Sequence, residues 1–279
     1  MKTILYIHGM GGGADSRIPS VLNGWFRKHR RDIRVVVRTY DFHPDRAAEQ
    51  IRAWYEELQP ALVIGESLGA NHALALYGRR SPGCGATALR GSRESDPSGG
   101  MLPRSAASPQ PANALPPLLL VSPALNAPKF LYALRLATRI PAVHRWINRI
   151  YKPREGRRQA LDFAPETLTA WGAYRSVADF AIANGRPQEP GHRRPEGAFP
   201  EGSKSPHLQG QGAPALKEEQ SKPYAFFGRR DHYRRYGVVS VKKWRRTFGP
   251  GTFEIYDGTH FMEETYLRKR LIPAILERI

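Results

Sequence analysis

The chain holds 279 residues with a formal net charge of +18, a length that suits one large α/β domain or two ordinary ones. Its single cysteine, Cys84, excludes an internal disulfide, and no Cys and His spacing is typical of a metal site. No apolar run approaches the roughly 18 residues that span a bilayer, and the N-terminus lacks a signal-peptide cleavage site. We therefore expect a cytoplasmic protein with no membrane span, metal or cofactor.

Strands and helices alternate in the first part of the chain. Residues 3–7 are continuously apolar, which is typical of a strand buried on both faces of a parallel sheet. Asp15 or Ser16 suits the N-cap of the next helix, and Pro44 suits the first turn of another. The predicted elements are strands over 3–7, 33–38 and 61–64 and helices over about 15–29, 44–58 and 68–77. This alternation predicts a parallel sheet with right-handed crossovers.

Two tracts interrupt this pattern. Residues 81–116 and 185–222 are rich in small residues, Gly and Pro, hold few large apolar side chains and show no period. Because such segments cannot bury enough apolar surface to offset their ordering entropy, we expect both to be disordered insertions.

The alternation resumes after the first tract. A fourth strand is predicted over 118–121, and residues 129–182 have a helical pattern. The remaining predicted elements are strands over 223–228 and 252–256, a helix over about 236–247 between them, and a closing helix that reaches about residue 276.

The stretch around Ser67 is the strongest candidate for chemistry. It reads Gly65-Glu66-Ser67-Leu68-Gly69 and lies between the third predicted strand and a helix. Glycine two residues on either side of the serine lets strand and helix approach closely at a strained turn. Ser67 then lies at a helix N-terminus, where unpaired backbone N–H groups stabilise a developing negative charge. A motif this short also arises by chance, which leaves a plain loop before a helix as the alternative.

The first predicted strand leads into a glycine-rich loop, His8-Gly9-Met10-Gly11-Gly12-Gly13. The amides of such a loop are free to face a ligand. Phosphate binding is the competing interpretation, but the Gly-Lys-Ser/Thr ending of a P-loop is absent and no G-x-G-x-x-G follows.

Polar or glycine elements follow four of the predicted strands. The loop at Gly9 follows strand one, Ser67 strand three, Asp231 strand five and His260 strand six. Ligands of open α/β sheets bind beyond the carboxyl ends of the strands. The presence of polar or glycine elements at four strand ends therefore indicates a catalytic site.

These residues make the chain resemble the α/β-hydrolase superfamily, whose members carry serine, acid and histidine in this chain order. The likeness runs from residue 3 to about 275, excluding the two tracts, and small single-domain bacterial esterases are the most similar members. It implies one α/β-hydrolase domain over residues 1–279, with about six mostly parallel strands in the order 2-1-3-4-5-6 and helices on both faces. It also implies a helical lid over residues 126–184, between strands four and five. The long tracts, and the lack of an N-terminal strand pair that larger members carry, depart from the family.

The resemblance also implies roles for individual residues. Ser67 would be the nucleophile, His260 the general base, and Asp231 the acid that orients the imidazole. The backbone N–H groups of Met10 and Leu68 would form the oxyanion hole.

Other polar residues near these positions leave alternatives open. Asp257 lies three residues before His260 and is an alternative acid, although Asp231 fits the strand-end pattern better. His8 is expected to shape the glycine loop, His72 to lie on the helix after Ser67, and His232 to be only a neighbour of the acid.

The function predicted is that of a serine hydrolase for small carboxylic esters or thioesters. Basic residues from Lys129 to Arg158 suggest an anionic head group or leaving group, and a solvated basic face explains them equally well. A peptidase, a carbon–carbon bond hydrolase, and a non-catalytic binding or scaffold protein that uses its basic surface remain alternatives. Nucleic-acid binding is not predicted as the main role, because no helix-turn-helix, zinc-finger or aromatic RNA-binding motif is present. The sequence does not indicate an oligomeric state.

Overall fold

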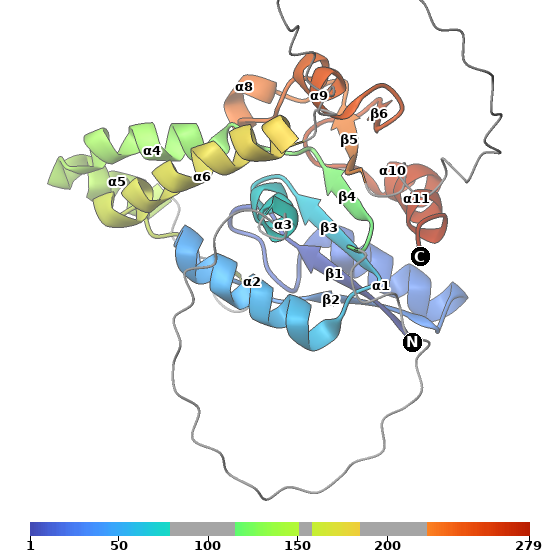
Figure 1. Cartoon of the computed structure of the whole chain (residues 1–279). Helices are drawn as coiled ribbons and strands as arrows, with labels where there is room; N and C mark the ends of the chain where they lie inside the picture. The colour runs from blue at the N-terminus through green and yellow to red at the C-terminus, as the bar shows by residue number, and fades with distance from the viewer. Residues whose placement is uncertain (79–114, 151–157, 185–221) are drawn as a thin grey trace, which may run out of the picture.

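A six-stranded parallel sheet forms the centre of the protein in a computed structural model that describes residues 1–78, 115–150, 158–184 and 222–279 (Figure 1). The strand order is β2-β1-β3-β4-β5-β6, and every neighbouring pair is parallel. This confirms the predicted sheet. The two tracts expected to be disordered, 81–116 and 185–222, lie almost entirely outside the described residues.

The elements follow the predicted alternation closely. The strands are β1 Lys2–Ile7, β2 Ile33–Val37, β3 Leu62–Glu66, β4 Leu118–Val121, β5 Tyr224–Gly228 and β6 Phe253–Tyr256. The helices are α1 Arg17–His29, α2 Pro44–Leu58, α3 Gly69–Gly78, α4 Ala127–Thr138, α5 Pro141–Ile150, α6 Pro165–Asn184, α8 Tyr233–Tyr236, α9 Val241–Phe248, α10 Glu264–Tyr266 and α11 Ile272–Leu276, and the π-helical turn η1 Leu267–Leu271 connects the last two.

The sheet buries an apolar core on each face, which explains why an inner strand such as β4 is wholly apolar, whereas the edge strands β2 and β6 each carry a charged residue. Alternate residues of one strand enter different cores: Leu5 belongs to the cluster that includes residues of α2, α3 and α9, whereas Ile4 belongs to the cluster that includes residues of α1, η1 and α11. The same alternation recurs in β3, where Val63 joins the first core and Ile64 the second. Both faces are therefore covered by helices.

In the described part of the excursion between β4 and β5, the chain forms three separate helices and not one continuous helical stretch. Proline at the first position of α5 (Pro141) and of α6 (Pro165) marks each restart, because proline suits a helix start and not its interior. A third apolar cluster holds α4 and α6 against Leu68, and its largest member is the fully buried Trp171. In Figure 1, α4 and α6 run side by side from α3 to α5, which forms the outer end of the excursion.

The helix predicted over about 236–247 begins later than expected, at Val241, and a separate short helix, α8, precedes it. α8 ends at Gly237, whose φ of 69° is in the left-handed region. A side chain there would also overlap the backbone of Ala127. α9 then begins after Ser240, whose hydroxyl caps it by accepting from the Lys243 N–H (3.3 Å).

Among the described residues, no helix combines the length and the apolarity that crossing a bilayer requires.

Candidate active site

Ser67 lies at a sharp turn between β3 and α3 and has a φ of 50°. A positive φ is costly for a residue with a side chain and persists only where the surrounding structure enforces it. Such a serine at a strand-to-helix turn is the geometry of a nucleophile elbow. The backbone thus holds the side chain above the carboxyl end of β3.

Close packing explains the two glycines of the motif. A Cβ at Gly65 would lie 2.8 Å from the Ala73 Cβ, so β3 and α3 approach this closely only with glycine. A Cβ at Gly69 would overlap the carbonyl oxygens of Ile7 and His8 at the end of β1. Both glycines are therefore required by the packing around the turn.

His260 bridges Ser67 and Asp231. Its Nε2 lies 2.8 Å from the Ser67 Oγ, and its Nδ1 lies 3.0 Å from Asp231 Oδ2. The Asp231 side chain is completely buried, His260 is 4% exposed, and Tyr236 stacks on the imidazole with ring centroids 4.2 Å apart. With Nδ1–H donating to the carboxylate, Nε2 is free to accept the serine proton. The structure thus brings together three groups that are distant in sequence.

Asp257, the alternative acid, points elsewhere. Its side chain is 66% exposed, and its Oδ1 lies 3.6 Å from the Arg230 Nε. His232 is exposed beside Asp231, at the start of α8. Of the two candidate carboxylates, only Asp231 contacts His260 in the described part of the chain.

The glycine loop after β1 lies against the nucleophile. A Cβ at Gly9 would lie 3.1 Å from the Ser67 Cβ and 3.7 Å from its Oγ, so glycine permits this approach. Within the described residues, the backbone N–H groups of Met10 and Leu68 donate to no protein acceptor. Both amides therefore remain available for a ligand beside Ser67.

Four features define the topology of the chain. They are the strand order, a serine with positive φ after β3, an acid after β5 and a histidine after β6. The chain has the α/β-hydrolase fold. In this fold the excursion of α4, α5 and α6 lies between β4 and β5, where a lid was predicted.

Several solved structures share the α/β-hydrolase fold. They include a carboxylesterase from the thaumarchaeon Nitrososphaera gargenis (12% identity, 99% of this chain and 91% of that one, TM-score 0.43). A meta-cleavage product hydrolase from Pseudomonas fluorescens (13%, 99% and 90%, 0.43) and a carboxylesterase from Bacillus subtilis (11%, 100% and 85%, 0.39) are also similar. No protein-family model and no curated protein sequence matches the chain. At identities and TM-scores this low, the similarities carry no information on the substrate.

A half-buried glutamate, Glu66, lies directly before Ser67 and was not singled out from the sequence. The Tyr6 hydroxyl donates to its Oε2 (2.7 Å), joining β1 to β3 beneath the site. Burial raises the pKa of Glu66 and, together with the nearby carboxyl, that of Tyr6. Glu66 thus ties together the strands that carry the serine and the glycine loop.

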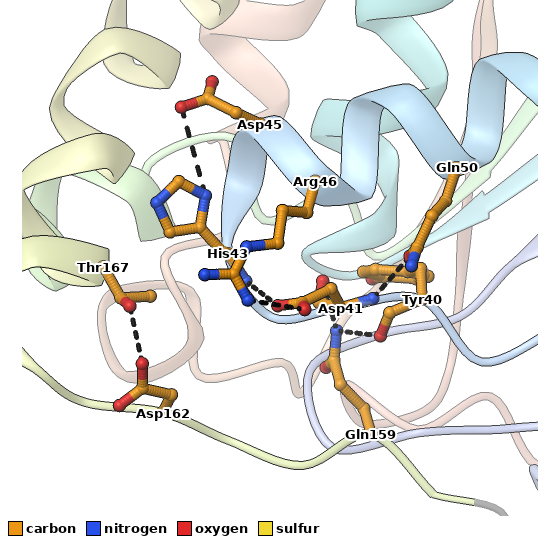
Figure 2. Close-up of polar contacts among 9 residues, drawn as sticks. All are labelled: Tyr40, Asp41, His43, Asp45, Arg46, Gln50, Gln159, Asp162 and Thr167. Carbon is orange, nitrogen blue, oxygen red and sulfur yellow. Dashed lines mark hydrogen bonds and ion pairs between the residues drawn. The ribbon is translucent and has the colours of Figure 1, made fainter.

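Gln159 ties the glycine loop to the segment between α5 and α6. The Gln159 side-chain Oε1 accepts a hydrogen bond from the Gly11 N–H (3.0 Å). The Gln159 backbone N–H donates to the Gly12 carbonyl oxygen (2.7 Å). Figure 2 shows its Nε2 directed at the carbonyl oxygens of Tyr40 (3.2 Å) and Asp41 (3.4 Å). Because the Gly11 N–H belongs to the peptide that follows Met10, this side chain fixes the loop beside Ser67. No motif marks Gln159, so no sequence signal could have identified it.

Replacing Gln159 with alanine is expected to lower kcat for a reaction at Ser67 by about 10- to 100-fold, because a small displacement of a hydrogen-bond donor beside a reacting group is costly. KM should change little, and the rate should be normalised to the active sites counted in a burst experiment. Thr167→Val is the matched control: it breaks a 2.7 Å bond to Asp162 close to α6 but leaves the glycine loop untouched (Figure 2). Equal kcat losses in both variants would mean that Gln159 acts only through stability.

Two buried histidines lie beneath the site. His8 stacks on Tyr40 with centroids 4.3 Å apart, and its Nδ1 lies 2.7 Å from the Gly9 carbonyl. His72, on α3, contacts the rings of Trp171 and Tyr174, and neither of its ring nitrogens has a partner among the described residues. Burial lowers the pKa of His8 to about 4 and that of His72 to about 3. Both are therefore neutral in the folded protein, and His8 fits the structural role expected for it.

Acid is expected to destabilise the protein through these two histidines. Their folded pKa values lie below the ordinary 6.5. Between the folded pKa values and 6.5, these histidines bind more protons in the unfolded chain than in the folded protein. The free energy of unfolding is therefore highest above pH 6.5 and falls as the pH drops towards about 4. At pH 5 each histidine costs about 2 kcal/mol.

Urea unfolding of wild type and His72→Phe at pH 7.5 and 5.0 measures this effect. The variant keeps an aromatic ring among its aromatic neighbours, and it should lose about 2 kcal/mol less stability on acidification than wild type. An unaltered pH dependence in His72→Phe would contradict the account of buried neutral histidines.

Proposed function

We propose that this protein is a serine hydrolase that cleaves carboxylic esters or thioesters through an acyl-enzyme intermediate. The observation that carries the proposal is the His260 ring, with Nε2 2.8 Å from the Ser67 Oγ and Nδ1 3.0 Å from Asp231 Oδ2. A serine, a base and an orienting carboxylate within hydrogen-bond reach are the arrangement that activates a hydroxyl nucleophile.

The first half of the reaction forms the acyl-enzyme. Ser67 Oγ attacks the carbonyl carbon while its proton passes to His260 Nε2. The carbonyl oxygen becomes an oxyanion, and the free N–H groups of Leu68 and Met10 are its proposed donors. The carbon–oxygen or carbon–sulfur bond then breaks, and the leaving group takes the proton from His260.

The second half releases the acid product. Water gives a proton to His260 and attacks the acyl carbon, and Ser67 recovers its proton as the carboxylic acid leaves. Buried Asp231 stabilises the imidazolium in both halves. Acidification should therefore slow turnover, because a protonated imidazole cannot act as a base.

Hydrolysis of p-nitrophenyl esters of varied acyl length and charge tests this function. We expect a burst of p-nitrophenol close to one equivalent per protein, because acylation of the serine precedes slower deacylation. The basic excursion favours anionic substrates, so acyl groups that carry a carboxylate or phosphate belong in the panel. The absence of turnover across all esters and thioesters would contradict the proposal.

A further inference from the structure

The stretch 130–150, which holds most of α4, all of α5 and the turn between them, exposes both large apolar and cationic side chains, here called the α4–α5 patch. Each of its apolar members is more than half exposed. Among the described residues, most of the exposed large apolar side chains lie between positions 130 and 150. Such a concentration is unusual for a surface that faces only water. The patch consists of Phe130, Leu136, Ile140, Trp146 and Ile150, together with Arg139, Arg145 and Arg149.

Helical spacing places the α5 members of the patch on one face. Four exposed residues of α5 form two pairs. Arg149 lies one turn after Arg145, and Ile150 lies one turn after Trp146. Ile147, on the opposite face, is buried. The outer face of α5 is therefore made of arginine and apolar side chains side by side, and not of a purely polar surface.

The charge of the patch is of one sign. No Asp or Glu occurs between residues 127 and 150. None of Arg139, Arg145 and Arg149 forms an ion pair with any residue that the structure describes. Their guanidinium groups remain available to an external anion.

The patch also has an accessible position. In Figure 1, α5 forms the outer end of the excursion, and α4 and α6 lead from it back to the sheet. A broad surface can therefore reach α5 without meeting the helices that cover the sheet.

We propose that the α4–α5 patch docks the protein onto the surface of an anionic lipid bilayer. Arginines attract acidic headgroups, and Trp146 with the neighbouring aliphatic side chains inserts at the boundary between headgroups and acyl chains. A nucleic acid would satisfy the arginines but leave the aliphatic side chains in water. A second copy of the chain would bring like charges together. Docking does not depend on the proposed hydrolase activity.

Co-sedimentation with vesicles tests the proposal. The full chain should bind vesicles of phosphatidylcholine with phosphatidylserine, bind pure phosphatidylcholine far more weakly, and be released by high salt. Substitution of Arg139, Arg145 and Arg149 by glutamate should weaken binding by at least about 100-fold. Trp146→Ala should weaken it by about tenfold, through loss of apolar burial.

A charge-matched variant separates the patch from overall charge. Arg31, Arg52 and Arg246 are exposed arginines outside the excursion, and none of them forms an ion pair with a described residue. Their joint substitution by glutamate changes the net charge equally but should retain most of the binding. Circular dichroism confirms that each variant is folded.

Three outcomes would overturn the proposal. One is equal loss of binding in both triple variants, which would indicate diffuse charge attraction. The second is the absence of binding to phosphatidylserine vesicles. The third is tighter, patch-dependent binding to an oligonucleotide than to these vesicles. Because vesicle binding needs no turnover, Ser67→Ala should bind like wild type, so failure of docking and failure of the hydrolase proposal are distinguishable.

Discussion

Ser67→Ala is expected to lower kcat for p-nitrophenyl ester hydrolysis by about 10⁶-fold, the scale of loss when a serine nucleophile is removed. The reason is chemical: the alanine methyl cannot attack a carbonyl or form an acyl-enzyme. The fold should survive, because among the described residues the side chain makes one hydrogen bond, to His260, and alanine occupies the same turn. Steady-state rates and the size of the product burst measure the effect.

Ser122→Ala is the matched control. Ser122 also has a positive φ, 46°, and follows the end of β4. Its Oγ lies 3.5 Å from the Tyr256 hydroxyl and contacts no histidine among the described residues. Its substitution should change kcat by no more than a few-fold, and a loss as large as that of Ser67→Ala would contradict the assignment of the nucleophile.

Asp231→Asn is expected to lower kcat by about 10⁴-fold while the fold is retained. An asparagine amide can donate to the imidazole, which favours the tautomer with the proton on Nε2. His260 then cannot accept the Ser67 proton across the 2.8 Å contact. The loss should appear in kcat with little change in KM, since the carboxylate does not contact substrate.

The same substitution at Asp257 separates the two candidate acids. Asp257 forms an exposed ion pair with Arg230 and is not expected to orient the His260 imidazole. Asp257→Asn should keep kcat within about twofold, because exposed ion pairs contribute little. Near-normal turnover of Asp231→Asn, with loss in Asp257→Asn, would reverse the assignment.

The sequence predicted the sheet and the positions of the site residues because both depend on local pattern. Apolar runs marked the strands, although β2 and β6 each contain a charged residue, and the carboxyl ends of parallel strands necessarily share one edge. Gly65 and Gly69 marked the turn because close packing excludes a Cβ at each. A short-range rule was sufficient for each of these features.

Other features depend on where side chains point, which no local rule determines. Asp231 and Asp257 both follow strands, and only the three-dimensional path turns the first towards His260 and the second towards Arg230. Gln159 reaches the glycine loop from 148 positions away in sequence. Such a contact leaves no periodic or spacing signal in the sequence.

The most direct test of the central claim, that Ser67 is an activated nucleophile, is labelling by a fluorophosphonate followed by peptide mapping. We expect one adduct per chain, on the peptide that contains Ser67, and loss of that adduct in His260→Ala, because the base activates the hydroxyl. An adduct on another residue, or ester turnover that persists while Ser67 stays unlabelled, would contradict the account.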